Sequence, residues 1–316
     1  MKKVLIADKA DSLCEKVLKE RGLEPVVKTG MKPEELKACI SQFDAIIVRS
    51  ATTLTRDLIE AATNLKAVAR AGSGVDNIDV LACIEKKVLV MNTPFGNTVS
   101  TGEHAVAMMM ALARHIPQAN ASTHAGKWEK KKFEGVELTG KTLGVIGCGN
   151  IGAVVADRAM GLKMNVVVFD PVMTTERARE LGVKMVSLDE LYAKADFITY
   201  HVTINPATKG MLNRDAIAKM KKGVRIVNCA RGGIMVEEDI KAALASGQLA
   251  GLACDVFVKE PATEHIFFGM ENVIVTPHIA ASTKDAQVTV ARQAAEQIAD
   301  YLLCGKRTHA VNGDKI

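Results

Sequence analysis

The stretch LGVIGCGNIGAVVA constrains the fold of this chain more than any other part of its 316 residues. In it, Gly147, Gly149 and Gly152 match the spacing G-x-G-x-x-G, after a strand-like run and before a helical one. Such glycines allow a tight turn and let a pyrophosphate approach the backbone at a helix N-terminus. Asp170 follows at the end of VVVFD, where its carboxylate can accept hydrogen bonds from ribose hydroxyls and would repel a 2′-phosphate. The pattern therefore predicts a dinucleotide-binding unit that takes NAD in preference to NADP.

Short β-branched runs alternate with helical patterns on both sides of this unit. Strand-like runs lie at residues 4–7, 45–48, 67–69 and 88–91, and again at 197–200, 224–228, 251–255 and 272–275. Capping boxes at 100–103 and 282–285 predict two longer helices, the second with Val288, Ala291, Ala295, Ile298 and Leu302 on one face. We therefore predict an α/β fold with two Rossmann-like parallel-sheet domains. These are a discontinuous substrate-binding domain (1–98 and 285–316) and an NAD-binding domain (99–284).

Composition argues against several other classes of protein. Aromatic residues make up only 4%, too few for binding single strands by base stacking, and the net charge of +5 is spread along the chain. The seven cysteines include no CxxC pair, no metal-ligand spacing is visible, and no apolar run is long enough to span a membrane. We expect a cytoplasmic protein with reduced thiols, a small anionic ligand, and no metal, nucleic acid or membrane partner.

Three residues with suitable chemistry each follow a predicted strand: Arg231 in VNCARGG, Glu260 in KEP and His278 in TPHIAAST. Oxidising an alcohol sends a proton to a base, and histidine titrates near neutrality. A carboxylate can orient its ring, and arginine can grip a substrate carboxylate through two hydrogen bonds. Each residue also has an ordinary alternative: a hydrogen-bonded loop histidine, a solvated glutamate before a proline, or an arginine that binds only cofactor phosphates. Together, behind a dinucleotide site, they predict an oxidoreductase.

With these motifs, the chain resembles the D-isomer-specific 2-hydroxyacid dehydrogenases over essentially its whole length. The segments NCARGG and TPH…AST are typical of that family, and RAGSGVDN (70–77) with KWEKKKF (127–133) indicates its 3-phosphoglycerate branch. The resemblance implies NAD-dependent interconversion of 3-phospho-D-glycerate and 3-phosphohydroxypyruvate, the first step of L-serine biosynthesis. One alternative is a reductase of glyoxylate, hydroxypyruvate or another 2-oxo acid. Another, from a different functional class, is an NAD-sensing corepressor built on the same fold.

The resemblance also implies roles at matching positions. The catalytic set is Arg231, Glu260 and His278. Besides the three glycines, the cofactor contacts are Ser73, Asn150, Ile151, Asp170, Val202, Cys229, Ala230, Arg231, Asp255, His278, Ile279, Ala280 and Ala281. The substrate contacts are Arg49, Arg70, Ser73, Gly74, Asn97, Arg231 and His278. Two arginines at strand ends and the backbone of a Gly-Ser-Gly turn suit a substrate with about three negative charges.

Some residues depart from the family pattern, and these departures bear on assembly and regulation. Lys130 stands where relatives usually have an arginine that contacts phosphate from a partner subunit, Thr203 replaces a frequent proline, and Ala280 replaces a glycine. The family implies a homodimer or homotetramer with a seam along the helix from about Ser100, although the Met-rich run there suits an interior core equally. Because the chain ends at VNGDKI, we expect no serine feedback through a regulatory region.

Overall fold

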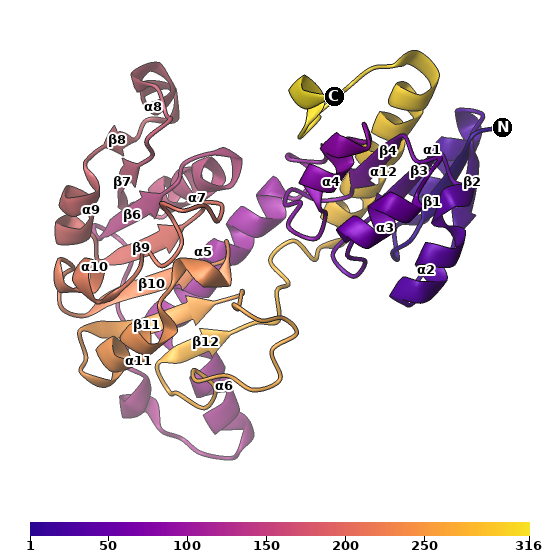
Figure 1. Ribbon diagram of the computed structural model, residues 1–316. Helices are drawn as coiled ribbons and strands as arrows, with labels where there is room; N and C mark the ends of the chain where they lie inside the picture. Colours follow the sequence, from indigo (N-terminus) through magenta and orange to yellow (C-terminus); the bar gives the residue numbers. More distant parts are fainter. The chain divides into compact units, whose positions relative to one another are not determined.

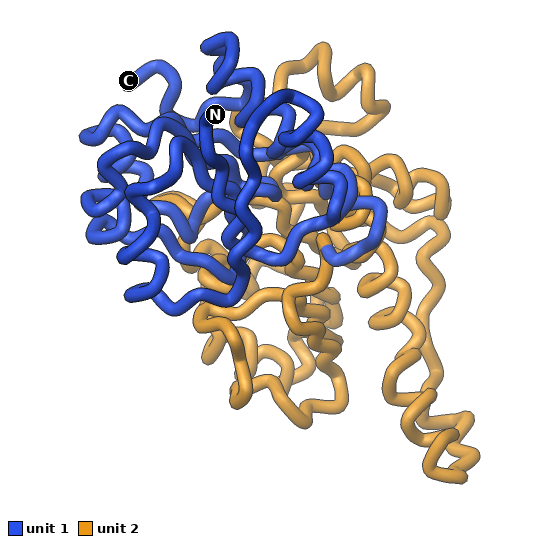
Figure 2. Tube along the Cα trace, turned by 90° about the vertical axis from the view of Figure 1, so that its right-hand side faces the viewer, with its two compact units in different colours: residues 1–97, 282–316 blue, residues 98–281 orange.

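The computed structural model describes all residues, 1–316, and they form two compact units (Figure 2). One unit contains residues 1–97 and 282–316, and the other contains residues 98–281. The boundaries expected from the sequence lie after residues 98 and 284. Each unit has its own parallel sheet with helices on both faces. The predicted α/β class with two Rossmann-like parallel sheets is confirmed, and the roles assigned to the two units stay predictions.

The first unit is built on a five-stranded sheet in the order β2-β1-β3-β4-β5. Its strands are β1 (Lys3–Ile6), β2 (Glu24–Val27), β3 (Ala45–Val48), β4 (Ala67–Arg70) and β5 (Leu89–Asn92). Successive side chains of a strand point to opposite faces, so Val4 and Ile6 pack in one core and Leu5 in the other. The first core contains α1 (Ser12–Glu20) and α12 (Lys284–Cys304); the second contains α2 (Pro33–Cys39), α3 (Arg56–Ala61) and α4 (Val80–Glu85). The last long helix of the chain thus packs beside α1 and on β3, β4 and β5 of this N-terminal sheet (Figure 1).

The second unit is built on a seven-stranded sheet in the order β12-β11-β10-β9-β6-β7-β8. Its strands are β6 (Thr142–Ile146), β7 (Asn165–Phe169), β8 (Lys184–Met185), β9 (Phe197–Tyr200), β10 (Val224–Asn228), β11 (Leu249–Cys254) and β12 (Val273–Val275). Helices α5 (Thr98–Arg114) and α7 (Asn150–Gly161) share one core, whereas α9 (Leu188–Lys194), α10 (Arg214–Ala218) and α11 (Glu237–Ala245) share the other. The two remaining helices are α6 (Ile116–His124) and α8 (Thr175–Leu181). The strand order reverses direction between β6 and β9, and ligands of such sheets bind outside the strand ends at that point.

Both predicted capping boxes are wrong in detail. Helix α5 begins at Thr98, so Ser100 lies inside its first turn. The cap of α12 is Thr283 rather than Ser282, because the Thr283 hydroxyl accepts the Ala286 amide at 3.1 Å. The predicted apolar face of this helix is also shifted: Val288 is 39% exposed, whereas Val290 is buried. The side of the helix that faces the sheet is formed by Val290 and by the buried residues one turn further along, such as Ala294.

Helix α5 is buried on one side only. Met108 and Met109 lie in the core, while Met110 is exposed. The helix approaches α7 so closely at Gly102 that a Cβ there would lie 2.6 Å from Cγ1 of Val154. No helix of the chain, α5 included, is long and apolar enough to cross a membrane.

Candidate active site and cofactor site

The glycine turn after β6 has the tight geometry expected from its spacing. Gly147 has φ +84°, and a Cβ there would lie 2.7 Å from the His201 carbonyl oxygen at the end of β9. A Cβ on Gly152 would lie 2.2 Å from the carbonyl oxygen of Gly147. The packing of the protein itself therefore requires glycine at both positions. The turn lies at the switch point of the seven-stranded sheet, between the ends of β6 and β9.

Gly149, in contrast, is not required by any contact within the protein. It has no positive φ, and a Cβ built on it would meet nothing within 4 Å. The open space lies at the N-cap of α7, whose first residues are Asn150 and Ile151. Unpaired backbone N–H groups and the helix dipole favour an anion there. This chain therefore fits a pyrophosphate at the position where the sequence predicts one.

Asp170 links the second strand of this unit to the glycine turn. One carboxylate oxygen accepts the Cys148 amide at 2.8 Å and the other accepts the Val172 amide at 2.9 Å. Each ionised carboxylate oxygen can accept more than one hydrogen bond, so the group can fix the turn and still accept ribose hydroxyls.

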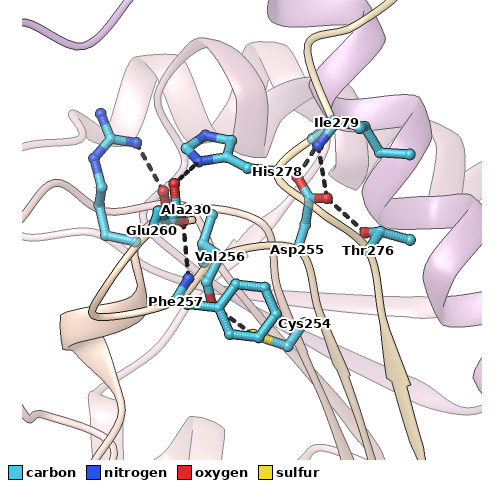
Figure 3. A network of polar contacts seen from close by, with 11 residues as sticks. Ala230, Cys254, Asp255, Val256, Phe257, Glu260, Thr276, His278 and Ile279 are labelled. Atoms are coloured by element: carbon cyan, nitrogen blue, oxygen red, sulfur yellow. Dashed lines mark hydrogen bonds and ion pairs between the residues drawn. The ribbon is translucent and has the colours of Figure 1, made fainter. Parts of the chain in front are cut away.

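His278 and Glu260 are hydrogen-bonded to each other at the carboxyl edge of the same sheet. The His278 Nδ1 atom lies 2.6 Å from the Glu260 Oε2 atom, and the second oxygen of Glu260 accepts the Phe257 amide at 2.9 Å (Figure 3). A proton on Nδ1 satisfies this contact and leaves the lone pair of Nε2 free, a tautomer assigned from the hydrogen bonds. The His278 side chain is 47% exposed, so that lone pair can serve a ligand. The geometry is that of a general base whose ring is held by a carboxylate.

His278 adopts the left-handed backbone conformation, at φ +53°. Its amide donates to the carbonyl oxygen of Asp255 at 2.9 Å, which fixes the turn after β12. Left-handed residues other than glycine are uncommon, and they concentrate at functional sites. The strain at this position therefore agrees with a functional role for the loop.

Arg231 reaches the same edge from the end of β10. Its guanidinium donates to the Ala230 carbonyl at 2.7 Å, and its own carbonyl accepts the Asn228 side chain at 2.9 Å. The next residue, Gly232, lies against the segment that carries Glu260, because a Cβ there would come within 2.1 Å of the Phe257 carbonyl carbon. All three predicted catalytic residues thus belong to one edge of one sheet.

Asp255 accepts hydrogen bonds from the residues on both sides of His278 and so holds the loop that carries it. This fully buried carboxylate accepts the amides of Ile279 and Ala280, each at 2.9 Å, and the Thr276 hydroxyl at 2.5 Å (Figure 3). Burial raises the pKa of Asp255, but hydrogen bonds from His104, from Thr276 and from the two amides outweigh this effect and leave the pKa below its usual value. The group is therefore a carboxylate at neutral pH and holds the loop by its charge.

The sequence reading did not assign a role to His104, which lies on α5. Its Nε2 atom lies 3.2 Å from the Thr276 hydroxyl oxygen and 3.6 Å from Asp255 Oδ1. The available signal was the histidine directly before the apolar run AVAMMMALA, because a largely enclosed polar side chain requires a hydrogen-bond partner.

The other predicted cofactor contacts of this unit lie around the same edge. Val202 borders the glycine turn, and Ala230 donates its amide to the Asn228 side chain at 3.0 Å. Cys229 is buried, and burial raises the pKa of its thiol well above the ordinary value. Ile279 is 41% exposed, and Ala281 is the last residue of the unit. Of these positions only Ile279 is exposed, so its side chain is the one that a ligand at this edge can cover.

The three departures from the family pattern lie in different surroundings. Ala280 is buried, and its methyl group packs in the core shared with α5 and α7. Thr203 lies in a turn, where its carbonyl accepts the Thr208 hydroxyl at 2.6 Å. Lys130 begins an exposed single turn of 3-10 helix, so it can reach solvent or another molecule.

The predicted substrate residues Arg49 and Arg70 lie together in the first unit. Arg49 follows Val48, whose register partner on β4 is Arg70. The Arg49 amide donates to the buried carboxylate of Asp8 at 2.5 Å, and its guanidinium donates to the Lys9 carbonyl at 3.0 Å. The Arg70 guanidinium lies over Gly72, where a Cβ would be 1.4 Å from Nη1. The glycine therefore provides the room for this side chain.

Ser73 and Asn97 adjoin the turn that follows Arg70. The Ser73 hydroxyl donates to the Asn97 side-chain oxygen at 2.6 Å, and the side-chain nitrogen of Asn92 donates to the Ser73 carbonyl at 2.6 Å. Gly74 continues the same turn. The five predicted substrate residues of this unit thus lie at the carboxyl edge of its sheet.

His201 gives the glycine turn a sensitivity to acid. Burial lowers the pKa of this histidine to about 4, and its Nε2 atom lies 2.9 Å from the Thr199 hydroxyl. Unfolded histidine titrates near 6.5, so between these pH values the unfolded chain binds more protons and stability falls as the pH falls. We expect this residue alone to remove about 2 kcal/mol of unfolding free energy between pH 7 and pH 5. Urea unfolding at both pH values should show a smaller loss in His201→Gln; an equal loss in both proteins would contradict this expectation.

The strand order, the glycine turn and the edge residues together define a nucleotide-dependent dehydrogenase. Residues 106–280 match the family model "D-isomer specific 2-hydroxyacid dehydrogenase, NAD binding domain". The chain therefore belongs to the D-isomer specific 2-hydroxyacid dehydrogenases, and NAD is its cofactor.

Individual relatives cover the whole chain. It is 46% identical over 316 residues to human D-3-phosphoglycerate dehydrogenase, which is 100% of this chain and 59% of that protein. Among solved structures, a glyoxylate reductase from Paecilomyes thermophila has a TM-score of 0.90 at 26% identity, over 99% of both chains. An NAD⁺-bound 3-phosphoglycerate dehydrogenase of Entamoeba histolytica has a TM-score of 0.83 at 29% identity, over 98% of both chains. The chain spans about 59% of the length of the human relative.

Proposed function

We propose that this chain interconverts 3-phospho-D-glycerate and 3-phosphohydroxypyruvate with NAD, the first step of L-serine biosynthesis. The observation that carries the proposal is the identity of 46% with a D-3-phosphoglycerate dehydrogenase along the entire chain. The His278–Glu260 pair of the second unit, and Arg49 and Arg70 at the ends of neighbouring strands of the first unit, supply the matching chemistry.

In the proposed reaction, His278 accepts the proton of the substrate hydroxyl on Nε2 and returns it in the reverse direction. Glu260 holds the opposite nitrogen and keeps the ring in the required orientation and tautomer. Arg231 binds the substrate carboxylate. The glycine turn, Asn150 and Asp170 hold NAD, whose nicotinamide supplies the hydride acceptor when it is bound.

Arg49 and Arg70 are proposed to bind the phosphate group. A hydrogen bond to a charged group contributes about 1.5–3 kcal/mol. Replacing either arginine by methionine should therefore raise KM for 3-phosphohydroxypyruvate at least about tenfold more than KM for glyoxylate. Arg56→Met is a matched control, because Arg56 pairs with Glu85 instead. An equal rise in KM for both substrates would contradict a phosphate-binding role for these arginines.

The test of the function as a whole is oxidation of NADH with 3-phosphohydroxypyruvate, glyoxylate and 2-oxoglutarate in parallel. A preference of about a hundredfold in kcat/KM for the phosphorylated acid, roughly 2.7 kcal/mol, is expected. The second candidate is a general 2-oxo-acid reductase, favoured by the likeness to a glyoxylate reductase. Comparable rates on glyoxylate would select it. Absence of turnover with NADH still bound would favour a corepressor.

We further propose a cytoplasmic homodimer, or a homotetramer made of two such dimers, with its seam on the exposed side of α5 and on α6. Met110 on α5, Ile116 on α6 and Trp128, four residues after α6, expose apolar surface, the last at 88%. Seven free cysteines, most of them buried, suit a reducing compartment. Light scattering should give twice the 33.9 kDa chain mass or four times that mass, and Met110→Glu should shift it toward the monomer. A monomeric wild-type protein would contradict the dimer.

A further inference from the structure

The segment that carries Glu260 has no regular structure of its own. No helix or strand lies between Cys254 and Val273. Connections of this length are uncommon in compact domains unless they are functional or braced by side chains. Glu260 must nevertheless be held closely, because its two oxygens serve His278 and the Phe257 amide.

A second histidine–carboxylate pair, apart from the first, joins this segment to α11. The His265 Nε2 atom is 3.1 Å from the Glu237 Oε1 atom, at the start of α11. Both atoms are enclosed and neither makes a hydrogen bond, so their 3.1 Å approach is a polar contact without hydrogen-bond geometry. The Phe267 amide donates to His265 Nδ1 at 3.4 Å, which favours the ring proton on Nε2, the nitrogen beside the glutamate. Removal of either side chain therefore leaves the other as an enclosed polar group without this polar neighbour.

The ring of His265 connects this pair to Glu260 through Phe257. The two ring centroids are 4.9 Å apart at 68°, the edge-to-face arrangement that aromatic pairs prefer. Phe268 closes the cluster, 5.7 Å from the His265 ring and 6.0 Å from that of Phe257. The backbone of Phe257 in turn donates to Glu260 and lies against Gly232, next to Arg231.

We propose that His265 and Glu237 are positioning residues for the His278–Glu260 pair. Their contact fastens the Glu260 segment to the segment between β10 and α11 that carries Arg231. The Phe257 amide transmits that constraint to the Glu260 carboxylate, and Glu260 fixes the His278 ring. The expected change in kcat rests on the proposed function, whereas the contacts of His265 and Glu237 are present in the protein without substrate.

The kinetic test compares Glu237→Ala and His265→Leu with the conservative Glu237→Gln, whose side chain keeps a polar oxygen beside the His265 ring. Misplacing a reacting group by a fraction of an ångström to an ångström can lower rates by up to about a hundredfold. We expect the two disruptive variants to lose about tenfold or more in kcat with little change in KM, and Glu237→Gln to stay within about twofold of wild type. Ile240→Val, at a buried position of α11 itself, is the control: it should lower Tm and leave kcat unchanged.

A second readout needs no turnover. The proton on His278 Nδ1, hydrogen-bonded to a carboxylate, should give a downfield NMR resonance, assigned by its loss in Glu260→Gln. This resonance should shift or broaden in Glu237→Ala and in His265→Leu and persist in Glu237→Gln and in Ile240→Val. A folded Glu237→Ala or His265→Leu protein with wild-type kcat and an unchanged resonance would overturn the proposal, as would an equal change in Ile240→Val. Failure of every substrate would refute the proposed function and leave the resonance to decide this assignment.

Discussion

Replacement of His278 by glutamine should lower kcat by about 10²–10⁴-fold, the contribution typical of general acid–base catalysis. Glutamine retains a side chain of similar length, but its amide cannot take up a proton at neutral pH. The defect should appear with every 2-oxo acid that the wild-type protein reduces, because the proton transfer is common to them. Steady-state kinetics measure the loss, and quenching of protein fluorescence by NADH checks that the cofactor still binds.

Two variants make this result specific. Glu260→Gln should lower kcat less than His278→Gln, because it alters the orientation of the ring and not the presence of the base. His124→Gln replaces an exposed histidine at the end of α6 and should leave kcat unchanged. A His278→Gln protein with more than a tenth of the wild-type kcat would assign the proton to another group.

Sequence periodicity predicted the central elements because they are buried on both sides. Strands such as Ala45–Val48 and Phe197–Tyr200 occur with the bounds expected from their apolar runs. Short elements at the rim, such as β8 (Lys184–Met185), were not predicted, since both of its residues are exposed and produce no hydrophobic pattern. The starts of α5 and α12 were misplaced because several hydroxyl side chains stand in a row there, and local spacing does not select among them.

The residues of the candidate site likewise fall into those that the sequence predicts and those that it does not. Motif spacing brought out Arg231, Glu260 and His278, since each follows a buried strand directly or within a short segment. It did not bring out Glu237 and His265, because their contact joins a helix start to an irregular segment and has no spacing of its own. Which partner satisfies a buried polar atom depends on tertiary structure, so such pairs emerge only from coordinates.

Substitutions in the glycine turn should also have large effects, and they distinguish glycines required for folding from glycines required for cofactor binding. Gly149→Ala should leave the unfolding free energy nearly unchanged, because the added methyl group would meet no protein atom within 4 Å. It should nevertheless weaken NADH binding about 10- to 100-fold, since the methyl group occupies space that the pyrophosphate needs, and overpacking of this kind costs about 1–3 kcal/mol.

Gly152→Ala is the counterpart, because its Cβ would lie 2.2 Å from the Gly147 carbonyl oxygen. That clash is internal to the protein, so the variant should lose about 1–3 kcal/mol of stability even without cofactor. Urea unfolding of the apo-proteins and NADH titration of each variant measure the two effects separately. Equal NADH affinity in Gly149→Ala and wild type would mean that the pyrophosphate does not lie at the N-terminus of α7. Loss of apo-protein stability in Gly152→Ala alone, with loss of affinity in Gly149→Ala, would place the cofactor against this turn, because only a bound ligand can make use of the space that Gly149 leaves open.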